Sequence, residues 1–273
     1  IVDYIVKNTV GALLNAHQRH PELGSGSKKG MPKPLNQVQG RHDRRSLTPK
    51  QASKLRILDP ACGSGSFLIG AYQYLLDWHR DWYVNDGPEK WATARSPVLY
   101  QVSGGPPAKV KRRAGLSAEG LRKAGDWRLT TAERKRILLN NIYGVDIDPQ
   151  AVEVTKLSLL LKVLEGENEQ TISRQLKMFH ERPLPDLGSN IKCGNSLIGP
   201  DFYEGRQLNL MDEEERLRIN VFDWKKEFAE IFAPSPQGEG RGEVKGFDAV
   251  IGNPPYGFHQ IHTENVKSYF KSN

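Results

Sequence analysis

Four consecutive residues near the end of the sequence, Asn253, Pro254, Pro255 and Tyr256, have groups suited to methylating an exocyclic amine on a planar base. The lone pair of such an amine is delocalised into the ring, so the amine is a weak nucleophile. The Asn253 side-chain oxygen and the Pro254 carbonyl can accept its two hydrogens and favour a more pyramidal nitrogen. Tyr256 can stack on the face of the base. The alternative explanation is a Pro-Pro turn with a surface tyrosine after a core strand.

The residues just before this stretch predict the element that positions it. Residues 247–250 form a short apolar run, which is typical of a buried strand. In open α/β sheets, ligands bind at the carboxyl ends of the strands. We therefore expect Asn253 to lie at a ligand-binding edge of a sheet.

A second stretch, residues 55–67, predicts a strand, a turn rich in Gly and Ser, and the start of an apolar helix. The small residues Gly63 and Gly65 allow a ligand to approach the backbone closely, and the free N–H groups of a helix start favour a carboxylate or phosphate. An ordinary strand-turn-helix unit without a ligand explains the same pattern.

The types of residue in this turn limit which ligand it could hold. A P-loop requires Lys and then Ser or Thr after the second glycine, where this sequence has Ser66 and Phe67. The spacing of its glycines does not fit the GxGxxG pattern of dinucleotide sites. A ligand with an amino-acid end, such as S-adenosylmethionine, remains, with Asp59 close to its ammonium group.

Two further strands are predicted, and each ends at a polar residue. Residues 142–148 predict a strand that ends at Asp146, where an acidic side chain can accept hydrogen bonds from ribose hydroxyls. A helix over residues 149–164 follows, with Asp148 as its N-cap. Residues 189–197 predict a third strand and a turn, in which Asn195 could reach an adenine edge. An ordinary turn asparagine is the alternative for Asn195.

The remaining regions are predicted from composition and periodicity. We expect an N-terminal helix over residues 1–18, a basic loop over 19–53 and the strand-turn-helix unit over 54–84. A basic insertion over 85–140 follows, with a helix at 131–140. The rest of the sheet is expected over 141–273, in which residues 207–232 are charged and helical.

The overall composition constrains partners and compartment. The net charge of +7 over 273 residues suits a polyanionic partner. Cys62 and Cys193 form no CxxC pair, which argues against a zinc site or a disulfide framework and for a cytoplasmic protein. We expect no metal site, and no apolar run is long enough to span a membrane. Pro200-Asp201 with Asp223-Trp-Lys225 only loosely matches a metal-dependent nuclease pattern.

Four segments, in this order along the chain, resemble the N6-adenine-specific DNA methyltransferases. They are Asp59-Pro-Ala-Cys-Gly-Ser-Gly-Ser-Phe67, Gly144-Val-Asp-Ile-Asp-Pro149, Cys193-Gly-Asn-Ser-Leu197 and Asn253-Pro-Pro-Tyr256. The basic insertion and residues 222–228 are similar to those of the large branch, which includes fused type II restriction-modification enzymes and related phage-defence methyltransferases. The resemblance covers most of the chain outside the insertion and the loops.

This resemblance implies an α/β fold, a Rossmann-like sheet of S-adenosylmethionine-dependent methyltransferases with strand order 3-2-1-4 in the part present and a helical and loop insertion. It implies cofactor contacts from Asp59, Ala61, Gly63, Gly65, Asp146, Ile147, Asn195 and Ser196, and catalysis by Asn253, Pro254, Pro255 and Tyr256. In that order, the strands that carry Cys62 and Cys193 lie two spacings apart, roughly 9.6 Å, beyond the limit of about 7 Å for a disulfide. We therefore expect two free thiols.

By the same resemblance, the partner is double-stranded DNA, from which an adenine is flipped out before its amine attacks the methyl group. We expect the target-recognition domain, and a fused or separate nuclease, to lie outside these 273 residues, and no turnover by these residues alone. Methyltransferases that act on RNA or on protein glutamine carry a similar catalytic stretch. A non-catalytic DNA-binding module is the alternative from a different functional class.

Overall fold

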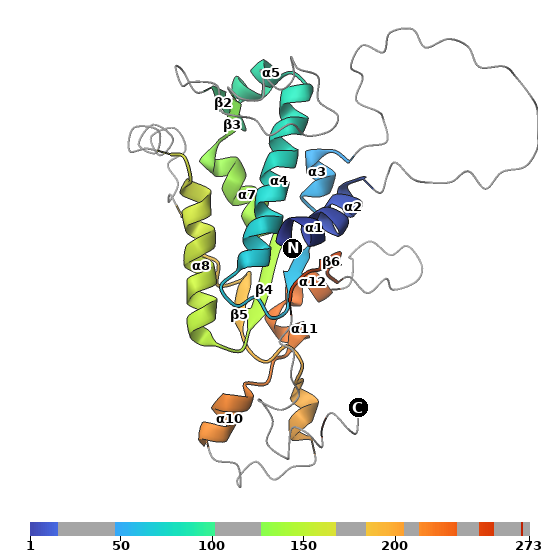
Figure 1. The fold of residues 1–273 in the computed structure, drawn as a ribbon, viewed down its shortest axis with the longest axis vertical. Helices are drawn as coiled ribbons and strands as arrows, with labels where there is room; N and C mark the ends of the chain where they lie inside the picture. The colour runs from blue at the N-terminus through green and yellow to red at the C-terminus, as the bar shows by residue number, and fades with distance from the viewer. Residues whose placement is uncertain are drawn as a thin grey trace, which may run out of the picture.

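The computed structural model describes residues 1–15, 47–101, 127–167, 184–204, 213–233, 246–253 and 269. Their centre is a four-stranded parallel sheet (Figure 1), formed by β1 (Ile57–Asp59), β4 (Ile142–Asp146), β5 (Ile191–Cys193) and β6 (Ala249–Val250). The strand order is β5-β4-β1-β6, and every pair in it is parallel. Counted along the chain within this sheet, the order is 3-2-1-4, which confirms the expected order.

Alternation along the strands gives the sheet two covered faces. Successive side chains of a strand point to opposite faces, so Ile57 and Ile142 contribute to one hydrophobic cluster, whereas Leu58 and Val145 contribute to another. Both faces of the sheet are therefore buried, as is usual for parallel sheets.

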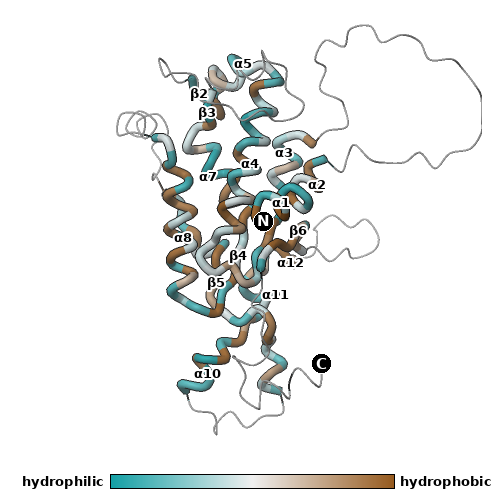
Figure 2. Tube along the Cα trace, in the orientation of Figure 1, coloured by the Kyte–Doolittle hydropathy of each residue, from teal (hydrophilic) through white to brown (hydrophobic). Residues whose placement is uncertain are grey.

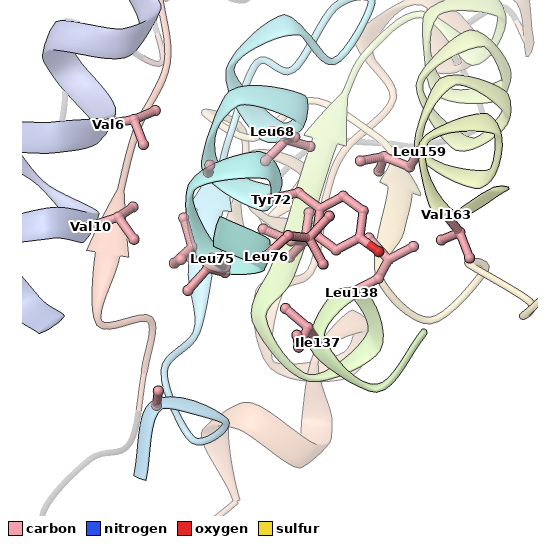
Figure 3. Close-up of a cluster of buried hydrophobic side chains, with 14 of the residues drawn as sticks. Val6, Val10, Leu68, Tyr72, Leu75, Leu76, Ile137, Leu138, Leu159 and Val163 are labelled. Atoms are coloured by element: carbon pink, nitrogen blue, oxygen red, sulfur yellow. The ribbon is translucent and has the colours of Figure 1, made fainter. Parts of the chain in front are cut away.

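The first face is covered by helices that surround α4 (Ser66–Asn85). Helix α4 contacts β1 and β4, and it also contacts α1 (Val2–Asn8), α7 (Thr131–Asn141) and α8 (Pro149–Leu164). Figure 3 shows side chains of α4 in the middle of this core, with the N-terminal helices on one side and α7 and α8 on the other. Tyr72 of α4 is fully buried, and its hydroxyl donates to the Arg134 carbonyl at 2.9 Å.

The second face is covered by an aromatic cluster from the chain just before β6. Phe228 and Phe247 pack against Tyr143 of β4. Phe222 and Trp224 pack against Phe228. Two short helices, α11 (Trp224–Glu227) and α12 (Ala229–Phe232), flank Phe228. Figure 2 shows hydrophobic residues along β6 and α12, whereas α5 at the upper end is mostly hydrophilic.

Helices α4 and α8 agree closely with the sequence prediction. Helix α8 begins at Pro149 after the N-cap Asp148, whose side chain accepts from the Gln150 N–H. The predicted helix 131–140 is α7, whose N-cap is Thr130; its side-chain oxygen accepts from the Glu133 N–H.

Three predictions about elements were wrong in part. The N-terminal helix is interrupted at Thr9, after which α2 (Val10–Asn15) begins; the Thr9 hydroxyl donates back to the Ile5 carbonyl at 2.8 Å. The end of the basic loop forms a short helix, α3 (Pro49–Ala52), which starts with a capping box. The charged helical region contains separate helices, α10 (Glu213–Ile219), α11 and α12.

The strand before Asn253 is also shorter and less buried than predicted. Only Ala249 and Val250 form β6, and the Val250 side chain is 60% exposed. The reason is its position, because β6 pairs with β1 alone and lies at the edge of the described sheet.

The basic insertion contains more regular structure than predicted. Beside α5 (Pro88–Ala92), it has an antiparallel pair of strands, β2 (Leu99–Gln101) and β3 (Trp127–Leu129). These elements lie around the far end of α4 in Figure 1. Most of the basic loop, residues 102–126 of the insertion and the segment with Pro254, Pro255 and Tyr256 lie outside the described residues.

Candidate functional site

The strands β1, β4 and β6 bring three predicted site residues to one edge of the sheet. Asp59 and Asp146 are the last residues of β1 and β4, and Asn253 follows β6 after two residues. Because the strands are parallel neighbours, their carboxyl ends meet at the same edge. Asn253 is exposed there.

The turn after β1 is fixed to the neighbouring strand and to α8. The Cys62 N–H donates to the Val145 carbonyl at 3.0 Å, and the Thr155 hydroxyl donates to the Gly63 carbonyl at 2.7 Å. Gly65, which precedes α4, has φ +82°, and a Cβ there would lie 2.9 Å from the Thr155 methyl group. The turn therefore requires glycine at residue 65, both for its backbone angle and for its contact with α8.

The Asp146 carboxylate links β4 to this turn. Its Oδ2 accepts from the Gly63 N–H at 2.7 Å, and its Oδ1 accepts from the Asp148 N–H at 2.9 Å. Two residues that the sequence assigned to one cofactor site, Asp146 and Gly63, are thus in direct contact. The space that a Cβ on Gly63 would enter is open to at least 4 Å, so a ligand can reach the backbone there.

The Asp59 carboxyl group has a different environment, although it lies at the same edge. It is 1% exposed, and its Oδ1 accepts from the Ala61 N–H at 3.1 Å. Burial raises its pKa from 3.8 to about 6; the Ala61 N–H opposes this shift, and the negative charge of Asp146 adds to it. At neutral pH the group is largely ionised, and it has the charge to receive an ammonium ion.

Gly252 brings the backbone before Asn253 directly over Asp59. It has φ +153°, and a Cβ at this position would lie 2.6 Å from Asp59 Oδ1. Only glycine permits this approach. The residue expected to bind the base and the carboxylate expected to bind the cofactor are therefore on adjoining segments.

The turn after β5 supplies Asn195 and Ser196, but part of their polar capacity is used within the protein. The Asn195 Oδ1 accepts from the Leu197 N–H at 3.1 Å, which closes the turn. The Ser196 carbonyl accepts from the Trp224 indole N–H at 3.1 Å. The Asn195 Nδ2 group is therefore the part of this side chain that could donate to an acceptor on an adenine edge. Ile147, one residue beyond β4, is 40% exposed at the same edge.

Sequence reasoning did not identify Asn220, which contacts this edge from the end of α10. Its carbonyl accepts from the Asn195 N–H at 2.6 Å. Its side chain contacts Cys193 and the carbonyl of Ile147. Asn220 lay inside the predicted helical region 207–232, and the single sequence signal was that asparagine can end a helix in a left-handed conformation.

The two cysteines are free, as expected. Burial raises the pKa of the Cys62 thiol to about 12, with smaller contributions from the charges of Asp146 and Asp59. Cys62 is thus a neutral thiol, which suits packing rather than nucleophilic attack.

The residues of the loose nuclease pattern have other partners. Asp201 accepts from the Tyr269 hydroxyl at 2.7 Å, and Asp223 caps α11 by accepting from two backbone N–H groups. Within the described ranges there is no group of three or more His, Cys, Asp or Glu residues that could hold a metal ion. The helices of this same part include none long and apolar enough to cross a membrane.

A cavity of about 570 Å³ lies elsewhere, at the far end of α4. Trp82, Tyr83 and Trp91 line it together with Glu133 and Arg136. Since Ser66 and Trp82 are the first and seventeenth residues of α4, about 24 Å of helix separates this cavity from the carboxyl edge of the sheet. It is not part of the candidate site.

Comparison with known proteins finds similarity to restriction-modification methylases. Residues 140–273 match the model of a family described as the Eco57I restriction-modification methylase. The type II restriction enzyme and methyltransferase RM.Eco57I of Escherichia coli is 29% identical over 201 residues, which is 74% of this chain and 14% of that protein. A putative type II restriction enzyme and methyltransferase of Methanocaldococcus jannaschii, RM.MjaORFECS2P, is 32% identical over 169 residues, 62% of this chain and 11% of that protein.

A third relative is described as an adenine-specific methyltransferase. The adenine-specific methyltransferase PglX of Streptomyces coelicolor is 24% identical over 207 residues, 74% of this chain and 12% of that protein. The chain thus corresponds to a small part of each relative. Through residues 140–273, the chain is similar to the Eco57I restriction-modification methylase family, and it is a distant homologue of RM.Eco57I and PglX.

Proposed function

We propose that this chain is the catalytic part of a DNA methyltransferase that transfers a methyl group from S-adenosylmethionine to the N6 amine of a flipped-out adenine, within a restriction-modification or phage-defence system. The observation that carries the proposal is the approach of Gly252 to Asp59, where an added Cβ would lie 2.6 Å from the carboxylate. This approach brings Asn253 beside the turn expected to bind the cofactor.

The groups at the edge fit the cofactor chemically. Asp59 is buried, and at neutral pH it is an anion that suits the ammonium group of the methionine portion. Asp146 keeps acceptor capacity for ribose hydroxyls beside its bonds to Gly63 and Asp148, because each carboxylate oxygen has two lone pairs. Ile147, Asn195 and Ser196 then surround the adenine portion, and Ala61 holds the turn through Asp59.

The cofactor supplies an activated methyl group when it is bound. The protein supplies the geometry, since Asn253 Oδ1 and the Pro254 carbonyl accept the hydrogens of the target amine and Tyr256 stacks on the base. No covalent enzyme intermediate is required, which agrees with the neutral, buried Cys62 thiol.

The proposed substrate is adenine in double-stranded DNA rather than RNA or protein glutamine. The family described as a restriction-modification methylase and the relative described as adenine-specific both support this choice. The net charge of +7 suits a polyanion. Since the chain matches 14% or less of each relative, target recognition and any nuclease are proposed to lie outside it.

Titration calorimetry of the full-length protein with S-adenosylmethionine tests the cofactor site. An Asp146→Ala variant should bind about 10- to 100-fold more weakly, because hydrogen bonds to a charged group contribute about 1.5–3 kcal/mol. The control is Asp148→Asn, which removes a neighbouring charge and keeps the cap of α8; it should bind like the wild type. Equal binding by Asp146→Ala and the wild type would contradict the assigned role of Asp146.

A further inference from the structure

Asn220 has an unusual backbone conformation at the carboxyl edge of the sheet. Its φ is +47°, and within the described ranges it is the one residue other than glycine with a positive φ. Its N–H donates to the Arg216 carbonyl at 3.0 Å, so it ends α10 in a left-handed conformation. Glycine would serve equally well as such a cap. Capping alone therefore does not require the amide group of the Asn220 side chain.

The Asn220 backbone and side chain contact three segments that border the proposed nucleoside site. The carbonyl accepts from the Asn195 N–H at 2.6 Å. The Nδ2 group lies 3.4 Å from Cys193 Sγ and 3.5 Å from the Ile147 carbonyl oxygen. Each side-chain contact is long, but the single amide group spans the ends of β4 and β5.

The position of Ile147 gives these contacts a functional consequence. The peptide group between Ile147 and Asp148 carries the Ile147 carbonyl, and its N–H, that of Asp148, donates to Asp146 Oδ1. A group that holds the Ile147 carbonyl therefore restrains the turn that orients the Asp146 carboxylate. The hydrogen bond from the Asn195 N–H to the Asn220 carbonyl restrains the turn after β5 through the same residue.

We propose that Asn220 is a positioning residue for the adenosine portion of S-adenosylmethionine, which acts by joining Ile147 to the turn at Asn195. This inference rests on the proposed function. Asn220 contacts neither the methyl group nor the target adenine in this role. Its loss should therefore weaken cofactor binding and leave the chemical step unchanged.

Two substitutions separate this role from that of a helix cap. Asn220→Gly keeps the left-handed conformation and the backbone hydrogen bonds but removes the amide group. Asn220→Asp keeps the shape of the side chain and tolerates the same conformation, but it cannot donate to the Ile147 carbonyl. A role limited to capping predicts that both variants behave like the wild type.

The test measures thermal unfolding, the Kd for S-adenosylmethionine, and steady-state kinetics on the full-length protein with duplex DNA. We expect Asn220→Gly and Asn220→Asp to raise the Kd and the KM for S-adenosylmethionine about three- to tenfold, with kcat, the KM for DNA and the Tm unchanged.

Two results would overturn the role of Asn220 without affecting the proposed function. The first is wild-type cofactor affinity in both variants, and the second is a loss of affinity accompanied by a fall in Tm. If the folded wild-type protein fails to bind S-adenosylmethionine, the proposed function fails first and the inference fails with it. That outcome is visible before any variant is compared.

Discussion

At the scale of single residues, the site depends on two carboxylates in different environments. Asp59 is almost completely buried, and its pKa is raised to about 6, whereas Asp146 is held by two backbone N–H groups. Because the folded-state pKa of Asp59 exceeds its ordinary value of 3.8, the folded protein binds this proton more tightly than the unfolded chain does. Its contribution to the free energy of unfolding is therefore greatest below about pH 4 and falls as the pH rises to about 6.

The same pKa predicts how cofactor affinity depends on pH. Binding of an ammonium group requires the ionised form of Asp59, and at about pH 5 only about one-tenth of the group is ionised. The Kd for S-adenosylmethionine should therefore rise about tenfold between about pH 7 and about pH 5. In Asp59→Asn the Kd should be higher and nearly independent of pH over this range. Calorimetry at several pH values makes the comparison, and a pH-independent Kd in the wild type would refute the assignment.

The sequence predicted the position of a site residue well when that position depends on neighbouring residues in the chain, and poorly when it depends on distant ones. Asp59 and Asp146 end their strands, and Gly63 lies in the turn after the first strand, so their placement at one edge followed from parallel pairing. The role of Asn220 depends on contacts with Cys193 and Ile147, which are 27 and 73 positions away in the sequence. No local pattern contains that information.

At the scale of elements, the turn between β1 and α4 is fixed by its packing against α8. Gly65 combines a positive φ with close contact to Thr155, whereas Gly87 has φ +98° and no atom within 4 Å of an added Cβ. A side chain at Gly87 would therefore cause backbone strain alone, whereas a side chain at Gly65 would cause both backbone strain and steric overlap.

This difference predicts two unequal losses of stability. Gly87→Ala should cost about 1 kcal/mol through backbone strain alone, and Gly65→Ala at least about 2 kcal/mol, because strain and overlap add. Replacing Thr155 by Ser in the Gly65→Ala background removes the crowding methyl group and should recover part of the loss. Urea denaturation measures the free energy of unfolding of the three variants. Equal losses for Gly65→Ala and Gly87→Ala would show that the contact of residue 65 with α8 does not contribute to the loss.

Long elements were predicted well from the sequence, and short ones poorly. Caps and apolar periodicity located α4 and α8 to within a few residues. The pairing of β2 with β3 was missed, because residues 102–126 separate the two strands and no tight turn signals the pair. Periodicity reports neither the hydrogen bond from the Thr9 hydroxyl to the Ile5 carbonyl at the helix break nor the edge position of the short β6.

At the scale of the whole molecule, short strands are held between two hydrophobic layers. Helix α4 forms the centre of one layer. The aromatic cluster around Phe228 forms the other and also contacts Phe247, just before β6. The second layer therefore connects the sheet to the segment that carries Asn253.

Removing the central ring of that cluster should destabilise the protein substantially. Phe228 is 3% exposed and contacts Tyr143, Phe222 and Phe247. Phe228→Ala should lower the free energy of unfolding by about 3–5 kcal/mol. Leu217→Ala, at a side chain that is 74% exposed, should change it by less than about 0.5 kcal/mol. Comparable effects of the two substitutions in chemical denaturation would argue against this second core.

The most direct test of the account is to identify the methylated product. The full-length protein is incubated with duplex DNA and S-adenosylmethionine labelled in its methyl group, and the DNA is digested to nucleosides. We predict label in N6-methyladenosine of the deoxy series, reduced at least about 100-fold in Asn253→Ala, whose site lacks one acceptor for the target amine. Label in another nucleoside or in protein, or an undiminished yield from Asn253→Ala, would contradict the proposed reaction.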